Sequence, residues 1–156
     1  MKLDKKQKVQ EDQYSYPYHY GSLFTDHSGI PYNIKIRKII DDLKKIKFSN
    51  LADIGCGDGF LIFKLNKEFP NKNFEGYDYS ESAIRFAKAF NPNQKFYTID
   101  FTKRNKKKRY DVIVCQEVLE HIRLKLVEDF IKNIKNSLKK GGFLILTVPS
   151  DNSPIS

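Results

Sequence analysis

At 156 residues the chain is long enough for one domain with a buried core and too short for two ordinary domains. Its apolar content of 40% argues against a disordered chain, and no apolar run approaches the roughly 20 residues that a membrane span needs. The 28 basic and 19 acidic residues leave a net charge of +9. Because the basic residues are spread along the chain, they favour a solvated lysine surface over a polyanion-binding one.

The two cysteines, Cys56 and Cys115, lie far apart and form no CxxC pair, which is typical of a reduced protein. The first residues lack the apolar segment of a secretory signal. We therefore expect a cytoplasmic protein with no membrane partner.

Residues 1–31 are predicted to form an N-terminal arm, and residues 32–156 a folded domain. Within the arm, the polar residues 1–13 predict a frayed start. The segment from Tyr14 to Tyr20 holds four tyrosines and one histidine, and Pro17 favours an extended backbone there. Such an aromatic segment either packs on the domain or closes over a ligand as a lid.

Apolar periodicity in the rest of the chain predicts alternating helices and strands. Helices are expected at 32–46, 60–69, 81–90 and 124–138, and strands at 50–54, 74–79, 95–100, 111–115 and 143–148. We expect Gly141 and Gly142 to end the last helix as a C-cap, and the basic connector 101–109 to be a solvated loop.

This alternation predicts an α/β fold, a three-layer sandwich with a mostly parallel sheet. Right-handed crossovers give the strand order 3-2-1-4-5. The order reverses between the first and fourth strands, and a ligand is expected beyond the carboxyl ends of the strands at that point.

A glycine-rich turn follows the first strand at this edge. Gly55, Gly57 and Gly59 let a ligand lie against the main chain, as in a nucleotide site. Asp53 and Asp58 flank the turn, and carboxylates there would repel the pyrophosphate of a nicotinamide dinucleotide. They suit the ammonium and sulfonium groups of S-adenosylmethionine.

Further polar groups follow the neighbouring strands. Asp78 ends the second strand, where it can accept both hydroxyls of a ribose. Asp100 follows the third strand, where it can accept from an adenine amino group while Phe101 covers the ring. Residues 116–121 follow the fourth strand and reach the same edge.

These motifs resemble those of class I S-adenosylmethionine-dependent methyltransferases. The resemblance covers about residues 32–150 and is carried by 53–59, 76–80, 100–101, 110–121 and 138–144. It implies S-adenosyl-L-methionine as the cofactor. The cofactor-binding residues that it implies are Asp53, Gly55, Cys56, Gly57, Asp58, Gly59, Asp78, Tyr79, Asp100, Phe101, Gln116 and Glu117.

The family's sheet normally finishes with a sixth and a seventh strand, whereas only residues 150–156 follow the fifth strand here. We therefore expect a C-terminally incomplete methyltransferase fold. Its fifth strand would be an exposed edge or would pair in a homodimer.

The segment Glu117-x-x-Glu120-His121 is similar to a metal-binding cluster of small-RNA ribose methyltransferases. Because no histidine follows His121, no metal is expected. We predict instead that His121 and Glu117 are catalytic, with His121 as a general base or as the group that orients the acceptor. Methyl transfer mainly requires in-line alignment and exclusion of water.

The predicted function is methyl transfer from S-adenosylmethionine to a small-molecule acceptor. One alternative is an RNA ribose 2′-O-methyltransferase, although nucleic acid is the less expected partner. Another is a non-catalytic fragment that binds the cofactor.

Overall fold

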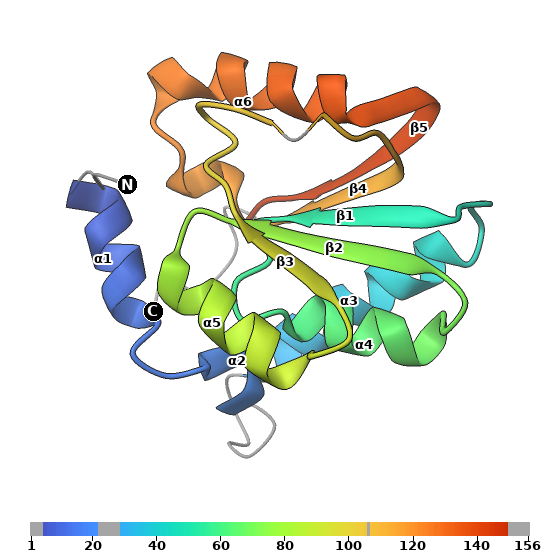
Figure 1. Ribbon diagram of the computed structural model, residues 1–156, viewed down its shortest axis with the longest axis horizontal. Helices are drawn as coiled ribbons and strands as arrows, with labels where there is room; N and C mark the ends of the chain where they lie inside the picture. The colour runs from blue at the N-terminus through green and yellow to red at the C-terminus, as the bar shows by residue number, and fades with distance from the viewer. Residues whose placement is uncertain (1–4, 22–28, 106, 150–156) are drawn as a thin grey trace.

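The computed structural model describes residues 5–21, 29–105 and 107–149, and all structural statements below concern these described residues. Five strands form one parallel sheet in the order β3-β2-β1-β4-β5 (Figure 1). The predicted fold class and strand order are therefore confirmed. The strands are β1 (Asn50–Ile54), β2 (Asn73–Asp78), β3 (Lys95–Thr98), β4 (Tyr110–Gln116) and β5 (Leu138–Thr147).

Helices cover both faces of the sheet and complete the three layers (Figure 1). One face carries α3 (Gly29–Leu43), α4 (Phe60–Glu68) and α5 (Glu81–Phe90), and the other carries α6 (Leu124–Ser137). Alternate strand residues serve the two faces, since Leu51 packs with the first group and Ala52 with α6. None of the described helices is long and apolar enough to cross a membrane.

The connector 101–109 completes the cover of the α6 face. Its Lys108 donates from Nζ to the buried Glu75 at 2.6 Å, and Glu75 also accepts from the hydroxyls of Tyr77, at 2.7 Å, and Tyr110. Burial alone would raise the pKa of Glu75, but the hydrogen bonds from Lys108, Tyr110 and Tyr77 outweigh it and lower that pKa. The exposed residues 103, 104, 107 and 109 agree with the expected solvated loop, whereas Lys108 is paired with a buried carboxylate.

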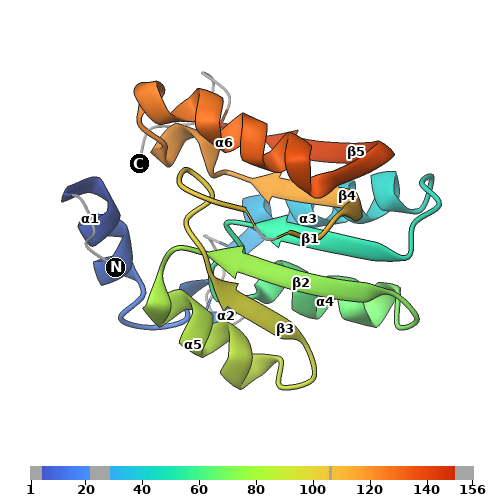
Figure 2. The same cartoon turned by 45° about the horizontal axis from the view of Figure 1, so that its top comes forward.

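The structure also corrects the predicted start of the chain. Residues 5–13 form a helix, α1 (Lys5–Gln13), and a short helix, α2 (Tyr18–Gly21), follows Pro17 where an extended segment was expected. Both lie beyond the carboxyl ends of the strands (Figure 2). Residues 1–4 and 22–28, which belong to the predicted arm, lie outside the described residues.

The predicted glycine cap of α6 is wrong as well. The helix ends at Ser137, and β5 begins directly with Leu138, whose backbone is extended. Gly141, at φ 76°, lies where the pairing of β4 and β5 shifts register, between the pairs Tyr110–Leu138 and Val112–Phe143. A positive φ suits a helix cap and a bulge equally, so only the strand pairing separates the two.

Strand β5 has β4 as its only partner among the described strands. Phe143 is 53% exposed and Leu146 39% exposed along it. The predictions about the chain beyond the fifth strand concern residues 150–156, which lie outside the described residues.

Candidate functional site

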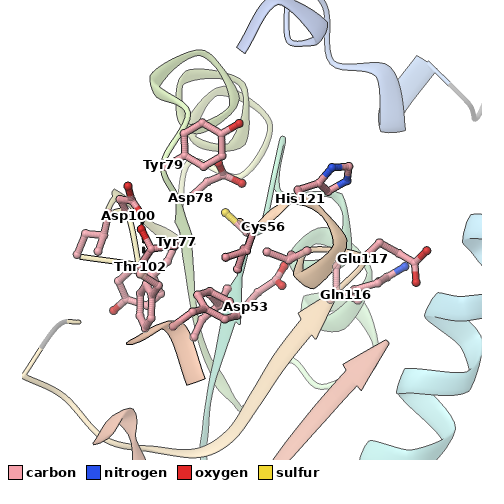
Figure 3. Close-up of a pocket in the computed structure, with 18 of the residues that line it drawn as sticks. Asp53, Cys56, Tyr77, Asp78, Tyr79, Asp100, Thr102, Gln116, Glu117 and His121 are labelled. Atoms are coloured by element: carbon pink, nitrogen blue, oxygen red, sulfur yellow. Dashed lines mark hydrogen bonds between the residues drawn. The ribbon is translucent and has the colours of Figure 1, made fainter. Parts of the chain in front are cut away.

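A cavity of about 370 Å³ opens at the carboxyl edge of the sheet, where the strand order reverses between β1 and β4 (Figure 3). Four chain segments that are distant in the sequence meet there, as the crossover argument predicts. Of the predicted site residues, the cavity is lined by Asp53, Gly55, Cys56, Asp78, Tyr79, Asp100, Phe101, Gln116, Glu117 and His121.

The glycine turn needs its glycines for contacts with the rest of the chain. A Cβ on Gly55 would collide with Val118, and one on Gly57 would lie 2.5 Å from the hydroxyl oxygen of Tyr14. At Gly59, φ is 80° and a Cβ would lie 3.0 Å from Ala87 of α5. Gly57 and Gly59 do not line the cavity, so they shape the turn and its packing.

Asp78 is buried at the end of β2 and is held by main-chain donors. Its Oδ2 accepts from the backbone N–H of Gly57 and its Oδ1 from that of Ser80, both at 2.9 Å. Burial raises the pKa of Asp78 to about 6, although these two hydrogen bonds oppose the shift. The carboxylate is therefore oriented before any ligand arrives.

Asp53 lies next to it at the end of β1 and is 2% exposed. Burial, with a smaller contribution from the negative charge of Asp78, raises the pKa of its carboxyl to about 8. Two carboxyl groups in one apolar recess disfavour a second negative charge. A cationic ligand group would remove that penalty, so this part of the cavity suits a cation.

Asp100 stands at the other end of the cavity, two residues after β3. Its Oδ1 accepts from the backbone N–H and the hydroxyl of Thr102, at 3.0 and 2.6 Å, and Lys103 Nζ lies 2.9 Å from its Oδ2. Burial would raise the pKa of Asp100, but the bonds from Thr102 and Lys103 prevail and lower it. Phe101 beside it packs edge-on against Tyr77, with ring centroids 5.4 Å apart.

Asp58 does not line the cavity, in contrast to the arrangement expected from the sequence. It is fully buried, its Oδ2 accepts from the backbone N–H of His19 at 3.0 Å, and its Oδ1 lies 3.0 Å from Nδ1 of the same residue. Asp58 therefore ties the arm to the glycine turn. The direction of this side chain depends on α2, which the sequence did not predict.

The arm supplies cavity residues, of which Tyr14 and His19 belong to the aromatic segment for which a lid was one expectation, whereas Gln7 and Gln13 were not predicted. Gln7, Gln13, Tyr14 and His19 line the cavity, and Gln7 donates from Nε2 to Asp100 at 3.3 Å. The His19 ring stacks on Tyr32 with centroids 4.5 Å apart. The tyrosine-rich segment indicated that Tyr14 and His19 could reach a ligand, whereas nothing in the sequence around Gln7, which stands among lysines, indicated a role for it.

Glu117 occupies the opposite wall in a left-handed backbone conformation, with φ 53°. Its Oε2 accepts from Lys35 Nζ at 2.7 Å and its Oε1 from the hydroxyl of Thr147 at 2.9 Å. His121, with a side chain 47% exposed, lies at the rim, 3.8 Å from Glu120. No group of three histidine, cysteine or acidic side chains in the described part of the chain is placed to hold a metal ion.

Gln116 is 8% exposed and ends β4 within the cavity lining. Neither its Oε1 nor its Nε2 has a hydrogen-bond partner among the described residues. Because a buried amide without partners costs free energy, this side chain is suited to a polar ligand.

The sequence model of a protein family described as "Methyltransferase domain" matches residues 52–144, which is more than half of the chain. The chain belongs to this family, and the predicted membership of the class I S-adenosylmethionine-dependent methyltransferases is confirmed.

Similar proteins include a ubiquinone biosynthesis O-methyltransferase of Rickettsia canadensis, 31% identical over 118 residues, or 72% of this chain and 48% of that protein. The N-methyltransferase NodS of Bradyrhizobium japonicum, solved with S-adenosyl-L-homocysteine, has a TM-score of 0.74 at 20% identity and covers 92% of this chain and 72% of its own. Magnesium protoporphyrin IX methyltransferase of Synechocystis, solved with bound SAM, has a TM-score of 0.68 at 18% identity. The match covers 88% of this chain and 73% of that protein's chain. The chain spans between a third and a half of the length of the first curated relatives that it matches.

Proposed function

We propose that the cavity binds S-adenosylmethionine and that the protein transfers its methyl group to a small-molecule acceptor. The observation that supports this most strongly is the convergence of Asp53, Asp78, Asp100 and Gln116 on one cavity beside the glycine turn. The cofactor is a cation with a ribose, an adenine and an amino-acid end, and these four side chains offer acceptors and donors for each part.

The adenosine half of the cofactor is assigned to the β2–β3 end of the cavity. The backbone N–H groups of Gly57 and Ser80 donate to Oδ2 and Oδ1 of Asp78, and because a carboxylate offers about four lone-pair sites it can still accept from ribose hydroxyls. Asp100 and Phe101 then serve the adenine as acceptor and apolar wall. The hydrogen bonds that fix both carboxylates are already formed, which reduces the entropy lost on binding.

The methionine half is assigned to the β1–β4 end. Asp53 lies there with an elevated pKa that a cationic group would lower, and Gln116 supplies an amide donor and an acceptor that lack partners among the described residues. Both features are costly without a ligand and favourable with this one.

The cofactor supplies a methyl group already activated by its sulfonium. The chain must therefore hold the acceptor in line with that group and exclude water. We assign the acceptor to the side lined by Tyr14, Tyr32 and His121, where His121 can accept a proton from a hydroxyl or an ammonium. Both oxygens of Glu117 are held by Lys35 and Thr147, so this residue acts as a fixed charge in the wall.

We also propose that the arm, residues 5–21, is a lid over the cofactor. Support comes from Gln7, Tyr14 and His19 in the cavity wall and from the tie between His19 and Asp58. Deleting residues 1–20 should weaken cofactor binding, measured by calorimetry. Unchanged affinity would rule the lid out.

Isothermal titration calorimetry with S-adenosylmethionine and with NAD tests the cofactor assignment. We expect the protein to bind the former and not the latter, and Asp78→Ala to weaken binding by about tenfold or more, because it removes charge-assisted hydrogen bonds. Asp42→Asn, a change at a carboxylate of α3 that does not line the cavity, serves as the matched control and should bind like the wild type.

Failure of the wild type to bind S-adenosylmethionine, or equal binding by Asp78→Ala, would contradict the assignment. The acceptor class is tested by formation of S-adenosylhomocysteine with panels of small hydroxyl and amine compounds and with RNA. Turnover on RNA alone would favour the ribose methyltransferase alternative. Cofactor binding without turnover on any acceptor would favour the non-catalytic alternative.

A further inference from the structure

Two basic segments that are distant in the sequence lie side by side on the face of the sheet that α6 covers (Figure 1). One is the connector after β3, and the other runs through the C-terminal half of α6 into β5. Asn105 Nδ2 donates to the carbonyl of Asn133 at 3.4 Å, and Arg109 Nη1 donates to the carbonyl of Leu138 at the same distance. These two contacts tie the segments together at both ends.

The exposed basic side chains of these segments form what we call the α6 basic surface. Its members are Lys103, Arg104, Lys107, Arg109, Lys132, Lys135, Lys139 and Lys140. Residues 103–109 and 131–140 contain no aspartate or glutamate. Within the described part of the chain, two members have an ion pair: Lys139 with Asp111 at 2.8 Å and Lys103 with Asp100 at 2.9 Å.

A general enrichment in lysine does not account for this arrangement, because the lysines of the α3 side are placed differently. Lys38 and Lys45 both pair with Asp42, at 2.9 and 3.1 Å, and Lys44 pairs with Glu68 at 3.7 Å. Acidic residues are thus interspersed with lysines on the α3 side and are missing from residues 103–109 and 131–140, whereas the first half of α6 carries the exposed Glu128 and Asp129. Like charges gathered without counter-charges repel one another, and an anionic partner relieves that repulsion.

We propose that the α6 basic surface binds the phosphate backbone of a nucleic-acid duplex. The part of α6 that belongs to this surface, residues 131–137, is about 10 Å long, and with the connector beside it the surface can face several phosphates. Residues 103–109 and 131–140 contain no aromatic side chain on which the bases of a single strand could stack. Contact is therefore made with phosphates and is independent of base sequence.

This inference does not rest on the proposed function, since the α6 basic surface and the cavity are lined by different residues. It revises the expectation of a merely solvated lysine surface. That expectation followed from basic residues spread along the sequence, whereas the fold brings two of the basic runs together.

Fluorescence anisotropy with labelled RNA and DNA duplexes, without cofactor and over a series of salt concentrations, tests the proposal. The informative triple variant neutralises three members that have no ion pair, and the control triple neutralises three exposed lysines next to the α3 side. The first is Lys132→Gln, Lys135→Gln and Lys140→Gln, and the second is Lys44→Gln, Lys45→Gln and Lys47→Gln. The two proteins have the same net charge.

We expect the wild type to bind duplex with a dissociation constant of about 1–100 μM near physiological salt, as for non-specific phosphate contacts. The α6 triple should bind about tenfold or more weakly, and its slope of log K against log salt should be smaller by about three. The control triple should stay within about twofold of the wild type, as expected if its lysines contact no phosphate. Circular dichroism and the three single variants guard against a folding defect, each single variant lowering the slope by about one.

Equal weakening by the two triples would overturn the proposal, because net charge and not this surface would then govern binding. Absence of duplex binding at low salt would overturn it too. The proposal would also be overturned if the protein bound vesicles of phosphatidylcholine and phosphatidylserine as tightly as duplex and the vesicles displaced the duplex. Tighter binding of the RNA or of the DNA duplex would support the proposal and identify the source of the phosphates.

Discussion

The change Asp53→Asn should stabilise the ligand-free protein at alkaline pH, although it removes a predicted cofactor-binding group. The carboxyl of Asp53 has a pKa of about 8 in the fold, against 3.8 for an unperturbed aspartate. Between these values the folded state keeps a proton that the unfolded state releases. The stability that this group contributes is therefore largest below its unfolded-state pKa and falls as the pH rises towards 8, by about 1.4 kcal/mol for each pH unit.

Between pH 6 and pH 8 this single group should lower the free energy of unfolding of the wild type by about 2 kcal/mol. The loss stays close to the full slope over most of the range, because the carboxyl is half ionised only at pH 8. An asparagine does not ionise, so Asp53→Asn should lose the slope. In a chain of 156 residues, 2 kcal/mol corresponds to about 4–8 °C in Tm. The stabilised variant should bind S-adenosylmethionine more weakly, a trade of function against stability.

Thermal and urea unfolding of both proteins at several pH values between 6 and 8 provide the measurement. Comparing the two proteins cancels the titration of shared groups that lie far from Asp53. Asp42→Asn is the matched control, because that exposed carboxylate has a lowered pKa and is ionised throughout the range. If the stability difference between wild type and Asp53→Asn is the same at pH 6 and pH 8, the reasoning about the buried carboxyl is refuted.

Other changes test the packing around the site. Glu75→Gln should lower the free energy of unfolding by about 1–3 kcal/mol in urea denaturation, because the buried hydroxyls of Tyr77 and Tyr110 would lose the charged acceptor of their hydrogen bonds, and a loss below about 0.5 kcal/mol would contradict this. Gly59→Ala should lower the free energy of unfolding by at least about 1 kcal/mol more than Gly141→Ala does. Both glycines have positive φ, but a Cβ meets neighbouring atoms only at Gly59, so equal losses would show that crowding plays no part. Asp58→Asn should loosen the arm and speed proteolytic cleavage within residues 5–21, measured by mass spectrometry, and an unchanged cleavage rate would show that the contact with His19 does not hold it.

The order of the sheet could be predicted from the sequence because it depends on local patterns and on one chiral rule. Strand 50–54 and the helix from Phe60 follow from apolar periodicity, and the right-handed crossover then places each strand. The same rule brings Asp53, Asp78 and Asp100 to one edge, because each lies at or just after the carboxyl end of a parallel strand.

The sequence could not predict which way a side chain points in a tight turn. Asp58 sits between two glycines of positive φ, and whether it faces the cavity or the arm is decided by α2, a helix of four residues without an amphipathic pattern. The same holds for Gln7, whose contact with Asp100 joins residues 93 positions apart.

Taken by itself, the sequence determined the α/β class, the strand order and the edge at which a ligand would bind, since these follow from short-range periodicity and from handedness. The tertiary structure alone decided that Gly141 belongs to a strand, that the arm forms part of the cavity wall and that two basic runs make one surface. Each of these depends on contacts between residues far apart in the chain, and such contacts leave no periodic pattern in the sequence.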